Sequence, residues 1–473
     1  MGGRWVFSIK LNPDGIIQFK ARYVAKGFTQ LPGINYGDTY APTPTMTTIR
    51  IFIQIVVQEA LLCHHCDVNN AYLNAPIDFE DVYIMQPEGY VTDPTLCCRL
   101  NKAIYGLKQA ANRWHATIIN FMLSQGLVQG TMDPCVFVRR TKSSTLIVLI
   151  WVDDLLIGAS DEKVMNQFKT NFAKAFAIKD LGCLKFFLGI EFVFGNNMVS
   201  MNQSFYIQQI LNKFNMTEAQ PRNLPIDPSV YDLLRLPSEE LENPTIYREI
   251  IGSLIYIMTA TRPDIAFAVT LLSRFMQKPT KMHLKLARGI LHYLIPTKDY
   301  DLKYWRTNEP LKIEGCSDSD WASDIDFQSI SGYTFRLNSA SALVSWRSGK
   351  QSLVAASSCE AEYVALFHAA LEGLFIRLVL SELLFAPPLT VMLYGDNIGS
   401  ITLAKHPAYH RKTRHINIKY HSIRKYVKNK SIALSYIPSR DNTADMATKP
   451  TKGPNMKNFA KIRGLSPKDY KIK

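Results

Sequence analysis

The chain has 473 residues, with 54 Lys and Arg against 40 Asp and Glu, so its formal net charge is +14. This length predicts two to four domains, and the hydrophobic content of 47% is enough for a core in each, which excludes a disordered chain and a collagen-like fibre. Eight scattered cysteines exclude a small disulfide scaffold and favour a reducing, intracellular setting. The basic excess indicates a nucleic acid or another anionic partner.

Targeting and membrane segments are not expected. The first residues lead straight into Trp5 without the pattern of a signal peptide. The most apolar run, residues 146–152, ends at Asp153 and Asp154 before it reaches the roughly 18 residues that a membrane helix needs. We therefore expect no membrane partner.

The N-terminal segment has the pattern of a β-hairpin. Residues 5–9 and 16–24 have the composition of strands, and the Asn-Pro-Asp-Gly sequence at residues 12–15 is typical of a turn. Apolar residues at helical spacing then predict helices over three segments: residues 47–62, 110–124 and 161–176.

The second half of the chain changes pattern twice. Four prolines between residues 221 and 237 predict a linker, and residues 247–293 have a mostly helical pattern. Short strands and turns follow from residue 311, and then a helix around residues 359–384. The pattern indicates a larger α/β module, a helical connector and a smaller α/β module.

Two adjacent carboxylates, Asp153 and Asp154, stand between two apolar strand-like runs. An ordinary hairpin with an Asp turn is one interpretation, but the pair lacks the glycine that tight hairpins favour. Charges flanked by core strands are costly unless a cation offsets them. If the segment before Asp67 is a strand beside this hairpin, three carboxylates meet there, and two bound metal ions would suit phosphoryl transfer.

At this point the chain is identified as similar to a known family. Trp-Val-Asp-Asp at residues 151–154 resembles the Y-x-D-D signature of reverse transcriptases, and residues 67–72 resemble their first palm motif. More specifically, the chain resembles the polymerase portion of Ty1/copia-type LTR retrotransposon polyproteins over nearly its whole length and in the family's order. The other matching segments are residues 5–7, 20–30, 105–110, 187–191, 261–265 and 448–450.

The resemblance implies roles for individual polymerase residues. Asp67, Asp153 and Asp154 would be catalytic metal ligands, and Tyr72 would be the steric gate that favours deoxynucleotides. Without the motif, Tyr72 would be taken for a core aromatic, and Lys20 for part of a solvated basic strand. The remaining implied residues are Lys20 and Arg22 for the triphosphate, Gln109 for the nucleotide pocket, Leu188 and Gly189 for the primer grip, and Lys179 as an acid for pyrophosphate. Unless the structure places Lys179 near the aspartates, it is interpreted as a surface lysine.

A second set of acids lies beyond the connector and resembles the Asp-Glu-Asp-Asp site of ribonucleases H. Each acid taken alone would be interpreted as a solvated surface side chain. As an ordered set, the four acids would hold two Mg²⁺ ions. Asp320 and Glu360 are neighbours that compete for the assignment. We expect Asp318 to end the first strand and Glu362 to precede a helix, and the loop at residues 438–442 lacks the histidine that many ribonucleases H carry. The expected catalytic and metal-binding set is Asp318, Glu362, Asp396 and Asp445.

A basic segment and a false zinc motif complete the candidates. Residues 405–430 contain nine Lys and Arg and no acid, with apolar residues at helical spacing, which indicates either a solvated helix face or a track for a phosphate backbone. Cys-His-His-Cys at residues 63–66 lacks a second ligand pair, so we interpret it as a strand and not a zinc site. The expected track residues are Lys405, Arg411, Lys412, Arg414, Lys419, Arg424 and Lys425.

The patterns predict an α/β (α+β) protein, and the resemblance implies a right-hand polymerase with fingers, palm and thumb, a helical connection, and a ribonuclease H-like α/β domain. The expected reaction is RNA-directed DNA synthesis with Mg²⁺ or Mn²⁺, two ions per active site. Its partners would be an RNA template, a DNA or tRNA primer, an RNA–DNA hybrid and deoxynucleoside triphosphates, in the cytoplasm or a virus-like particle. The expected domains are residues 1–229 (fingers and palm to about 195, then the thumb), 230–308, 309–450 and a tail, 451–473.

Two other interpretations stay open at this stage. One is a catalytically inactive remnant that only binds nucleic acid, because Met1 falls where relatives continue upstream and because Trp151 and residues 111–112 depart from the commoner Tyr and Pro-Arg. The seven intact carboxylates favour activity. The other is a DNA-templated polymerase, against which the ribonuclease H pattern argues, since that pattern implies an RNA–DNA hybrid.

Overall fold

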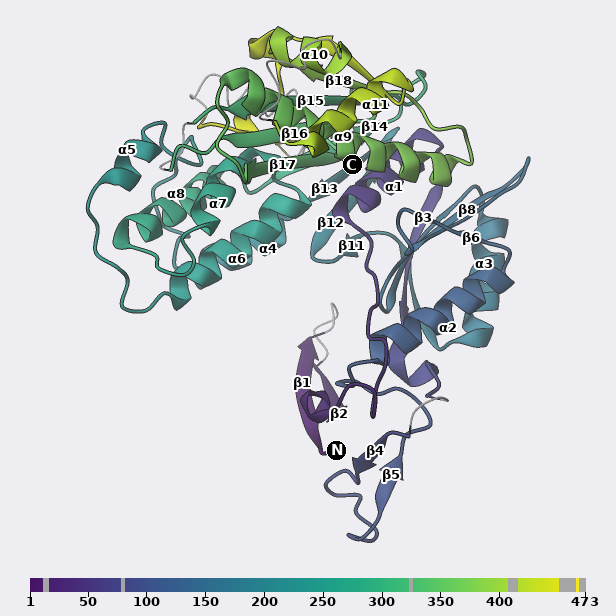
Figure 1. Cartoon of the computed structure of the whole chain (residues 1–473). Coiled ribbons are helices and arrows are strands. Elements are labelled where there is room, and N and C mark those ends of the chain that lie inside the picture. Colours follow the sequence, from purple (N-terminus) through teal and green to yellow (C-terminus); the bar gives the residue numbers. More distant parts are fainter. Residues whose placement is uncertain (12–16, 78–80, 323–325, 407–415, 451–464, 468–473) are drawn as a thin grey trace. The chain divides into compact units, whose positions relative to one another are not determined.

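The structure is a computed structural model that describes residues 1–11, 17–77, 81–322, 326–406, 416–450 and 465–467. The chain forms two compact units (Figure 1). Unit 1 contains residues 1–44 and 62–184, and unit 2 contains residues 45–61 and 185–473. The helix α1 (Met46–Gln58) and everything from residue 185 onward therefore belong to unit 2, although α1 and residues 185–229 lie within the expected polymerase region, residues 1–229.

Unit 1 is built on a six-stranded antiparallel sheet with the order β10-β3-β9-β8-β7-β6. The helices α2 (Ala110–Ser124) and α3 (Glu162–Ala175) pack on it through apolar stripes. Trp114 of α2 and Phe172 of α3 share a core with the sheet residues Val148 and Leu155. The strands are β3 (Leu62–Val68), β6 (Val128–Gln129), β7 (Val136–Arg140), β8 (Thr145–Trp151), β9 (Asp154–Ala159) and β10 (Ile178–Cys183).

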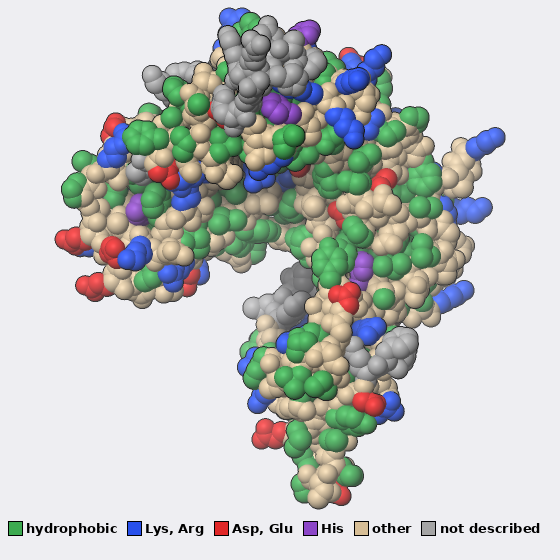
Figure 2. All heavy atoms as spheres, viewed as in Figure 1, with side chains coloured by type: hydrophobic (Ala, Val, Ile, Leu, Met, Phe, Trp, Pro, Cys, Tyr) green, Lys and Arg blue, Asp and Glu red, His purple; other side chains and the backbone are tan. Residues whose placement is uncertain are grey.

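Two hairpins extend unit 1. β1 (Gly3–Leu11) pairs with β2 (Ile17–Ala25), and β4 (Tyr83–Met85) pairs with β5 (Cys97–Arg99). One face of the β1–β2 hairpin is apolar and largely exposed, with Phe7 and Phe19 about three-quarters accessible, and Figure 2 shows hydrophobic side chains on the surface there. The alternation of side chains along β2 places Lys20 and Arg22 together on the opposite face.

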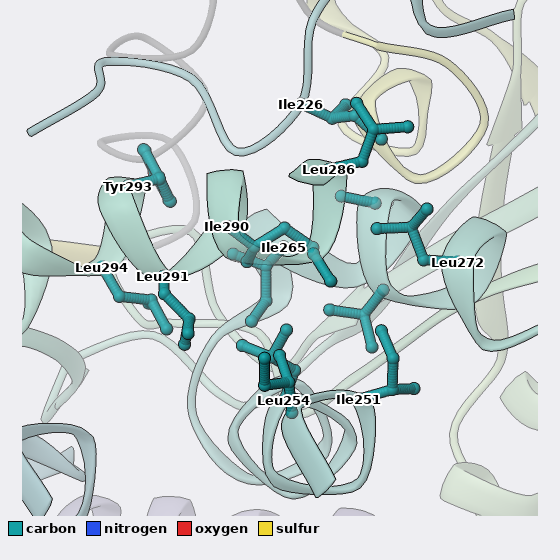
Figure 3. Close-up of a cluster of buried hydrophobic side chains, with 14 of the residues drawn as sticks. Ile226, Ile251, Leu254, Ile265, Leu272, Leu286, Ile290, Leu291, Tyr293 and Leu294 are labelled. Atoms are coloured by element: carbon teal, nitrogen blue, oxygen red, sulfur yellow. The ribbon is translucent and has the colours of Figure 1, made fainter. Parts of the chain in front are cut away.

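The helices of the connector form one hydrophobic core in unit 2. Figure 3 shows Ile251 and Leu254 of α6 packing with Leu272 of α7 and with residues of α8. The same core includes Ile330 of a strand in the C-terminal module, so connector and module are packed as one body. The connector helices are α5 (Val230–Arg235), α6 (Thr245–Ala260), α7 (Ala266–Ser273) and α8 (Lys281–Thr297), and α4 (Ser204–Lys213) of the expected thumb joins the same core.

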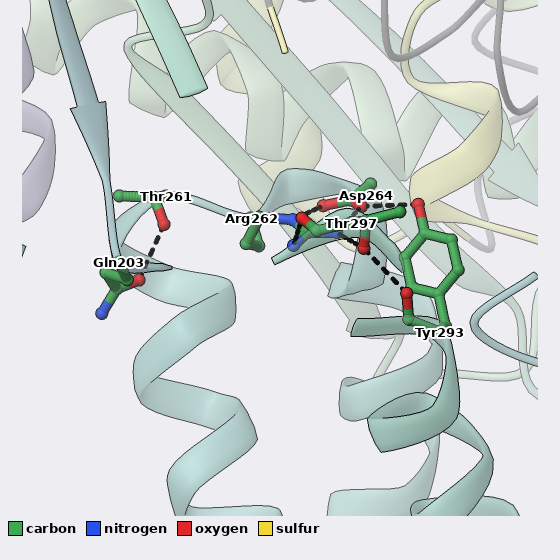
Figure 4. A network of polar contacts seen from close by, with 6 residues as sticks. All are labelled: Gln203, Thr261, Arg262, Asp264, Tyr293 and Thr297. Carbon is green, nitrogen blue, oxygen red and sulfur yellow. Dashed lines mark hydrogen bonds and ion pairs between the residues drawn. The ribbon is translucent and has the colours of Figure 1, made fainter. Parts of the chain in front are cut away.

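A buried ion pair lies within this core (Figure 4). Arg262 has no exposed surface and binds both carboxylate oxygens of Asp264, at 2.9 and 2.6 Å. It also donates to the carbonyl and the hydroxyl of Thr297, both at 2.8 Å, while the Tyr293 hydroxyl donates to Asp264 at 2.7 Å. Every charge in the pair therefore has several partners, which is the condition for burying ions.

Unit 2 contains two five-stranded sheets. The first has the order β11-β12-β13-β14-β20, and the second has the order β17-β16-β15-β18-β19. In the second sheet β15, β16 and β17 are antiparallel, whereas β18 and β19 run parallel to β15. The strands are β11 (Phe186–Phe187), β12 (Ile190–Gly195), β13 (Met198–Asn202), β14 (Tyr300–Trp305), β15 (Ile313–Asp320), β16 (Ile330–Arg336), β17 (Ser345–Lys350), β18 (Val391–Gly395), β19 (Ile432–Tyr436) and β20 (Leu465–Pro467).

A long apolar helix, α9 (Ser358–Leu384), packs on the second sheet and contacts β15, β16 and β18. Its length and composition would let it cross a membrane, which corrects the expectation that the chain lacks such an apolar stretch. Here 56% of its most apolar window is buried inside unit 2, and the helix carries Glu360 and Glu362 at its start. Such burial is typical of a core helix, so the length and composition of α9 are only weak evidence for a membrane span.

The structure confirms most predicted elements and corrects several of their bounds. α2 covers the predicted 110–124, and α3 and the β1–β2 hairpin lie where they were expected. α1 ends at Gln58, because Leu62 already starts β3. Asp318 does not end its strand, since β15 continues to Asp320. The predicted turn at residues 12–15 lies outside the described residues.

Candidate active sites

The sheet of unit 1 brings the predicted palm aspartates together. Asp67 on β3 is the register partner of Asp154 on β9, and Asp154 pairs with Trp151 across the hairpin turn. On the other edge of β3, Lys179 of β10 stands opposite Asp67. Since residues in register point to the same face of a sheet, the two carboxylates and the lysine lie in one row. The predicted pairing of the two segments is confirmed.

Asp153 occupies the turn between β8 and β9. The preceding residue, Val152, has a φ of +58°, which is strained for a β-branched side chain. Its carbonyl accepts a hydrogen bond of 2.5 Å from the Trp114 indole, and the Asp153 carbonyl accepts one of 2.8 Å from the Val68 amide. Burial raises the pKa of Asp153, and the charges of Asp154 and Asp67 raise it further. The fold thus concentrates negative charge at this turn.

An arginine and two tyrosines stand beside these carboxylates. The Arg22 guanidinium lies 5.3 Å from the centre of the Tyr105 ring, and the rings of Tyr72 and Tyr105 are 4.8 Å apart. Burial and the charge of Asp153 raise the pKa of both tyrosines. Tyr105 was not singled out from the sequence, although it lies in a matching segment.

The Gln109 side chain forms hydrogen bonds within unit 1. Its side chain is fully buried, accepts a hydrogen bond of 2.9 Å from the Gln30 amide and donates one of 3.0 Å to the Asn35 carbonyl. Its amide group therefore anchors the segment at residues 30–35. Lys20 lies two residues before Arg22 on the same face of β2, so both predicted triphosphate residues share that face.

The Gly106 backbone lies close against the end of β2, and Gly106→Ala is expected to weaken this contact. Its φ is +92°, and an added Cβ would lie 2.2 Å from the Ala25 carbonyl oxygen. We expect a loss of about 1–3 kcal/mol in stability, because the added Cβ would disturb the contact in which the Ala25 amide bonds the Tyr105 carbonyl at 2.8 Å. The free energy of urea unfolding measures this effect. Gly33→Ala is the control, since its φ is +75° but nothing lies within 4 Å of the added Cβ; an equal loss there would contradict the close-contact explanation.

The Cys-His-His-Cys motif forms part of β3, and its two histidines contact charged side chains. The His65 ring bonds the Asp154 carboxylate at 2.7 Å, and the His64 ring contacts the Lys169 ammonium at 2.5 Å. Cys63 and Cys66 are buried. His65 is a site residue that sequence reasoning missed; its position two residues before Asp67, on the same face of the strand, was the available signal.

The predicted primer-grip residues belong to unit 2. Leu188 and Gly189 form the turn between β11 and β12, with φ values of +50° and +69°.

The second carboxylate site lies at the end of the β15–β18 sheet. The ligand oxygens of Asp318, Glu362 and Asp396 all lie within 4.8 Å of one another, the one such group of three within the described part of the chain. Glu362 also accepts a hydrogen bond of 3.2 Å from the Ser319 amide. Its rival Glu360 bonds the Ala356 amide at 2.8 Å instead. Contrary to expectation, Glu362 does not precede its helix, because Ser357 caps the helix and α9 begins at Ser358.

The fourth predicted acid, Asp445, stands outside this group of three. It forms an ion pair with Lys449, one helical turn along the chain, and Thr448 donates a hydrogen bond to Asp318. On the loop that lacks a histidine, the Ser439 hydroxyl donates to Asp396 at 2.6 Å. Sequence reasoning missed these three partners, of which Lys449 was visible as an i, i+4 charge pair.

The cluster of three carboxylates formed by Asp318, Glu362 and Asp396 has the ligand chemistry that divalent metal ions need. Its donors are all oxygen, which suits Mg²⁺, and burial together with mutual repulsion raises the pKa of Asp318 to about 7 and that of Glu362 to about 9. A cation would remove this repulsion. The palm aspartates offer the same chemistry, although Asp154 is engaged by His65.

These raised pKa values predict the pH dependence of the metal-free protein. Between the ordinary values of 3.8 and 4.5 and the raised values of about 7 and about 9, the folded state binds more protons than the unfolded state. The contribution of Asp318 and Glu362 to stability therefore falls as pH rises through this window. Thermal unfolding of unit 2 in EDTA should show a lower midpoint at about pH 9 than at about pH 6, and Mg²⁺ should restore more at the higher pH. Glu362→Gln should reduce this difference, and an unchanged pH response in this variant would contradict the assignment.

Part of the predicted basic track is described. Tyr420 and Ile423 are buried on the inner face of η5 (Ile418–His421) and α11 (Ser422–Lys428), as the helical spacing predicts. Figure 2 shows Lys and Arg side chains on the surface over α11. Arg424 spends one donor on the Leu403 carbonyl at 3.0 Å. Lys405, Lys419 and Lys425 are described, whereas Arg411, Lys412 and Arg414 lie outside the described residues.

Comparisons with known proteins identify the chain's relatives. Residues 1–228 match the family described as "Reverse transcriptase (RNA-dependent DNA polymerase)". The chain is 37% identical to the "Retrovirus-related Pol polyprotein from transposon RE1" of Arabidopsis thaliana, over 98% of this chain and 32% of that protein. It is 31% identical to the "Putative transposon Ty5-1 protein YCL074W" of Saccharomyces cerevisiae, over 65% of this chain and 99% of that protein.

Among solved structures, the foamy viral protease–reverse transcriptase in complex with an RNA/DNA hybrid is 12% identical, with 92% of this chain and 50% of that chain covered and a TM-score of 0.49. The chain spans about a third of the length of the RE1 polyprotein. By its relatives and its matching domain, this chain belongs to the Pol polyproteins of copia-type retrotransposons and includes their reverse transcriptase domain.

Proposed function

We propose that this chain copies RNA into DNA and cleaves the RNA strand of the resulting hybrid. The observation that carries the polymerase assignment is the register of Asp67 with Asp154, beside Asp153 at a strained turn. The nuclease assignment is carried by the group of Asp318, Glu362 and Asp396, whose oxygens lie within 4.8 Å. The two sites lie in different units, so each activity can be tested separately.

In unit 1, Asp67, Asp153 and Asp154 would hold two Mg²⁺ ions. When bound, the ions would activate the primer hydroxyl and stabilise the pyrophosphate leaving group. Arg22 would neutralise the incoming triphosphate from the hairpin, and the Tyr72 ring would crowd a ribose 2′-hydroxyl and so select deoxynucleotides. The Tyr105 ring contacts both the Arg22 guanidinium and the Tyr72 ring and would keep both in place.

In unit 2, Asp318, Glu362 and Asp396 would hold the ions that activate water for RNA cleavage. The hydrogen bond from the Ser319 amide fixes the Glu362 carboxylate, and Ser439, on the loop that follows β19, orients Asp396. Asp445, paired with Lys449, would join the site by exchanging that partner for a metal ion. Lys405, Lys419 and Lys425 would contact the phosphate backbone of the hybrid.

The decisive experiment uses the purified chain, a labelled DNA primer on an RNA template, all four deoxynucleoside triphosphates and Mg²⁺. We expect primer extension, cleavage of the RNA strand, and loss of both with EDTA. Matched reactions with ribonucleotides and with a DNA template test selectivity. A folded chain that binds the duplex without extending it would replace this proposal with the binding-only remnant.

A further inference from the structure

His65 lies on the face of β3 that carries Asp67. Side chains alternate along a strand, so His65 and Asp67 share one face of β3 and His64 lies on the other. Asp67 is in register with Asp154 of β9. His65 is in register with Leu156, two residues further along β9, so it is a diagonal neighbour of Asp154 on the same face. The two histidines of the motif therefore belong to different sides of the sheet.

The contact between His65 and Asp154 is close and sheltered from solvent. The His65 Nε2 atom lies 2.7 Å from the Oδ1 oxygen of Asp154. The His65 side chain is 10% accessible and the Asp154 side chain 27%. In this bond the imidazole N–H donates and the carboxylate oxygen accepts. Because a ring packed inside the protein keeps one orientation, the bond fixes the direction of the carboxylate and engages one of its two oxygens.

We propose that His65 is a positioning residue for DNA synthesis, which orients Asp154 so that its second oxygen, Oδ2, binds a metal ion. The inference rests on the proposed polymerase function, in which Asp154 is a metal ligand. A carboxylate that turns freely must lose that freedom when an ion binds, whereas one held by a second residue has already lost it. Removing such a partner typically weakens metal binding or activity by about 10–100-fold.

The test compares two substitutions of His65. His65→Leu removes the donor and fills much of the same space, whereas His65→Gln keeps an N–H donor at a similar distance from the backbone. We expect the Mg²⁺ concentration for half-maximal primer extension to rise about tenfold in His65→Leu and to return to within about threefold of wild type in His65→Gln. The Mg²⁺ requirement of hybrid cleavage should not change, because that site lies in unit 2.

Metal binding is also measured without turnover. Binding of Mn²⁺ to the whole chain is followed by the loss of the free-ion signal in electron paramagnetic resonance. Asp153→Asn serves as the reference that defines the share of binding due to unit 1, and His65→Leu should weaken that share about tenfold. His64→Leu is the matched control, since its ring contacts Lys169 on the other face of β3. This control should keep the wild-type Mg²⁺ requirement.

Three results would overturn the inference. One is an unchanged Mg²⁺ requirement in His65→Leu. Another is a lower requirement, which would show that His65 competes with the ion for Asp154. The third is a lower thermal midpoint with slower extension at every Mg²⁺ concentration and no shift in the requirement, which would assign His65 to stability alone.

Failure of the proposed polymerase function has a different signature. In that case the wild-type chain itself extends no primer, and the inference fails with it. Extension by wild type alongside an unaffected His65→Leu variant removes only the inference.

Discussion

Asp153→Asn is expected to reduce primer extension by about 1,000-fold or more while hybrid cleavage continues. The substitution keeps the size and the hydrogen bonds of the turn but removes one of three charges that would bind metal. Since the Asp153 carbonyl, and not its side chain, accepts the bond from the Val68 amide, the hairpin should keep its geometry. Single-turnover extension and RNA cleavage, measured on the same hybrid, test this separation.

The reciprocal control is Asp396→Asn. It neutralises one of the three clustered carboxylates in unit 2, so it should abolish RNA cleavage without changing primer extension. Loss of both activities in either variant would mean that the two sites are not independent. Retention of extension by Asp153→Asn would remove Asp153 from the polymerase site.

Arg262→Ala is expected to destabilise unit 2 by about 3–5 kcal/mol. The substitution leaves Asp264 buried with its charge uncompensated and removes the bonds to Thr297 (Figure 4). The surrounding core extends into the C-terminal module through Ile330. We therefore expect the connector to unfold and hybrid cleavage to disappear over the same range of urea concentration.

Its control is an exposed arginine of the same unit. Arg235 pairs with Asp232 at 3.4 Å, and both side chains are more than half accessible. Arg235→Ala should leave the urea midpoint essentially unchanged, because exposed ion pairs contribute little. A second variant, Arg262→Met with Asp264→Leu, should recover part of the lost stability by removing both charges. Equal midpoints for Arg262→Ala and wild type would show that the network does not support the core.

Local patterns predicted the framework of the proposed polymerase site. The apolar run before Asp153 and the strand leading to Asp67 each show their structure over a few residues, and the pairing of the two segments follows from placing carboxylates together. The same holds for α2 and α3, whose apolar residues repeat at helical spacing. Such elements need no knowledge of distant partners.

The sequence could not show which distant residues complete the sites. Arg50 of α1 donates to the Val344 carbonyl, 294 residues away, and so joins unit 2 instead of its neighbours in sequence. The bonds of His65 to Asp154 and of Tyr256 to Leu188 likewise depend on tertiary packing. The helix start at Ser358 was predictable, since Ser357 and Glu360 have the spacing of a capping box.

The apolar helix α9 also has a consequence for the order in which the protein is made. Strands β15, β16 and β17 precede α9 in the chain, whereas β18 and β19 follow it. The first three strands therefore leave the ribosome before the helix and offer it an apolar surface as it emerges. A chain that stopped soon after Leu384 would leave β15 without its parallel neighbour β18 and would expose much of α9. Premature termination there should yield an insoluble fragment.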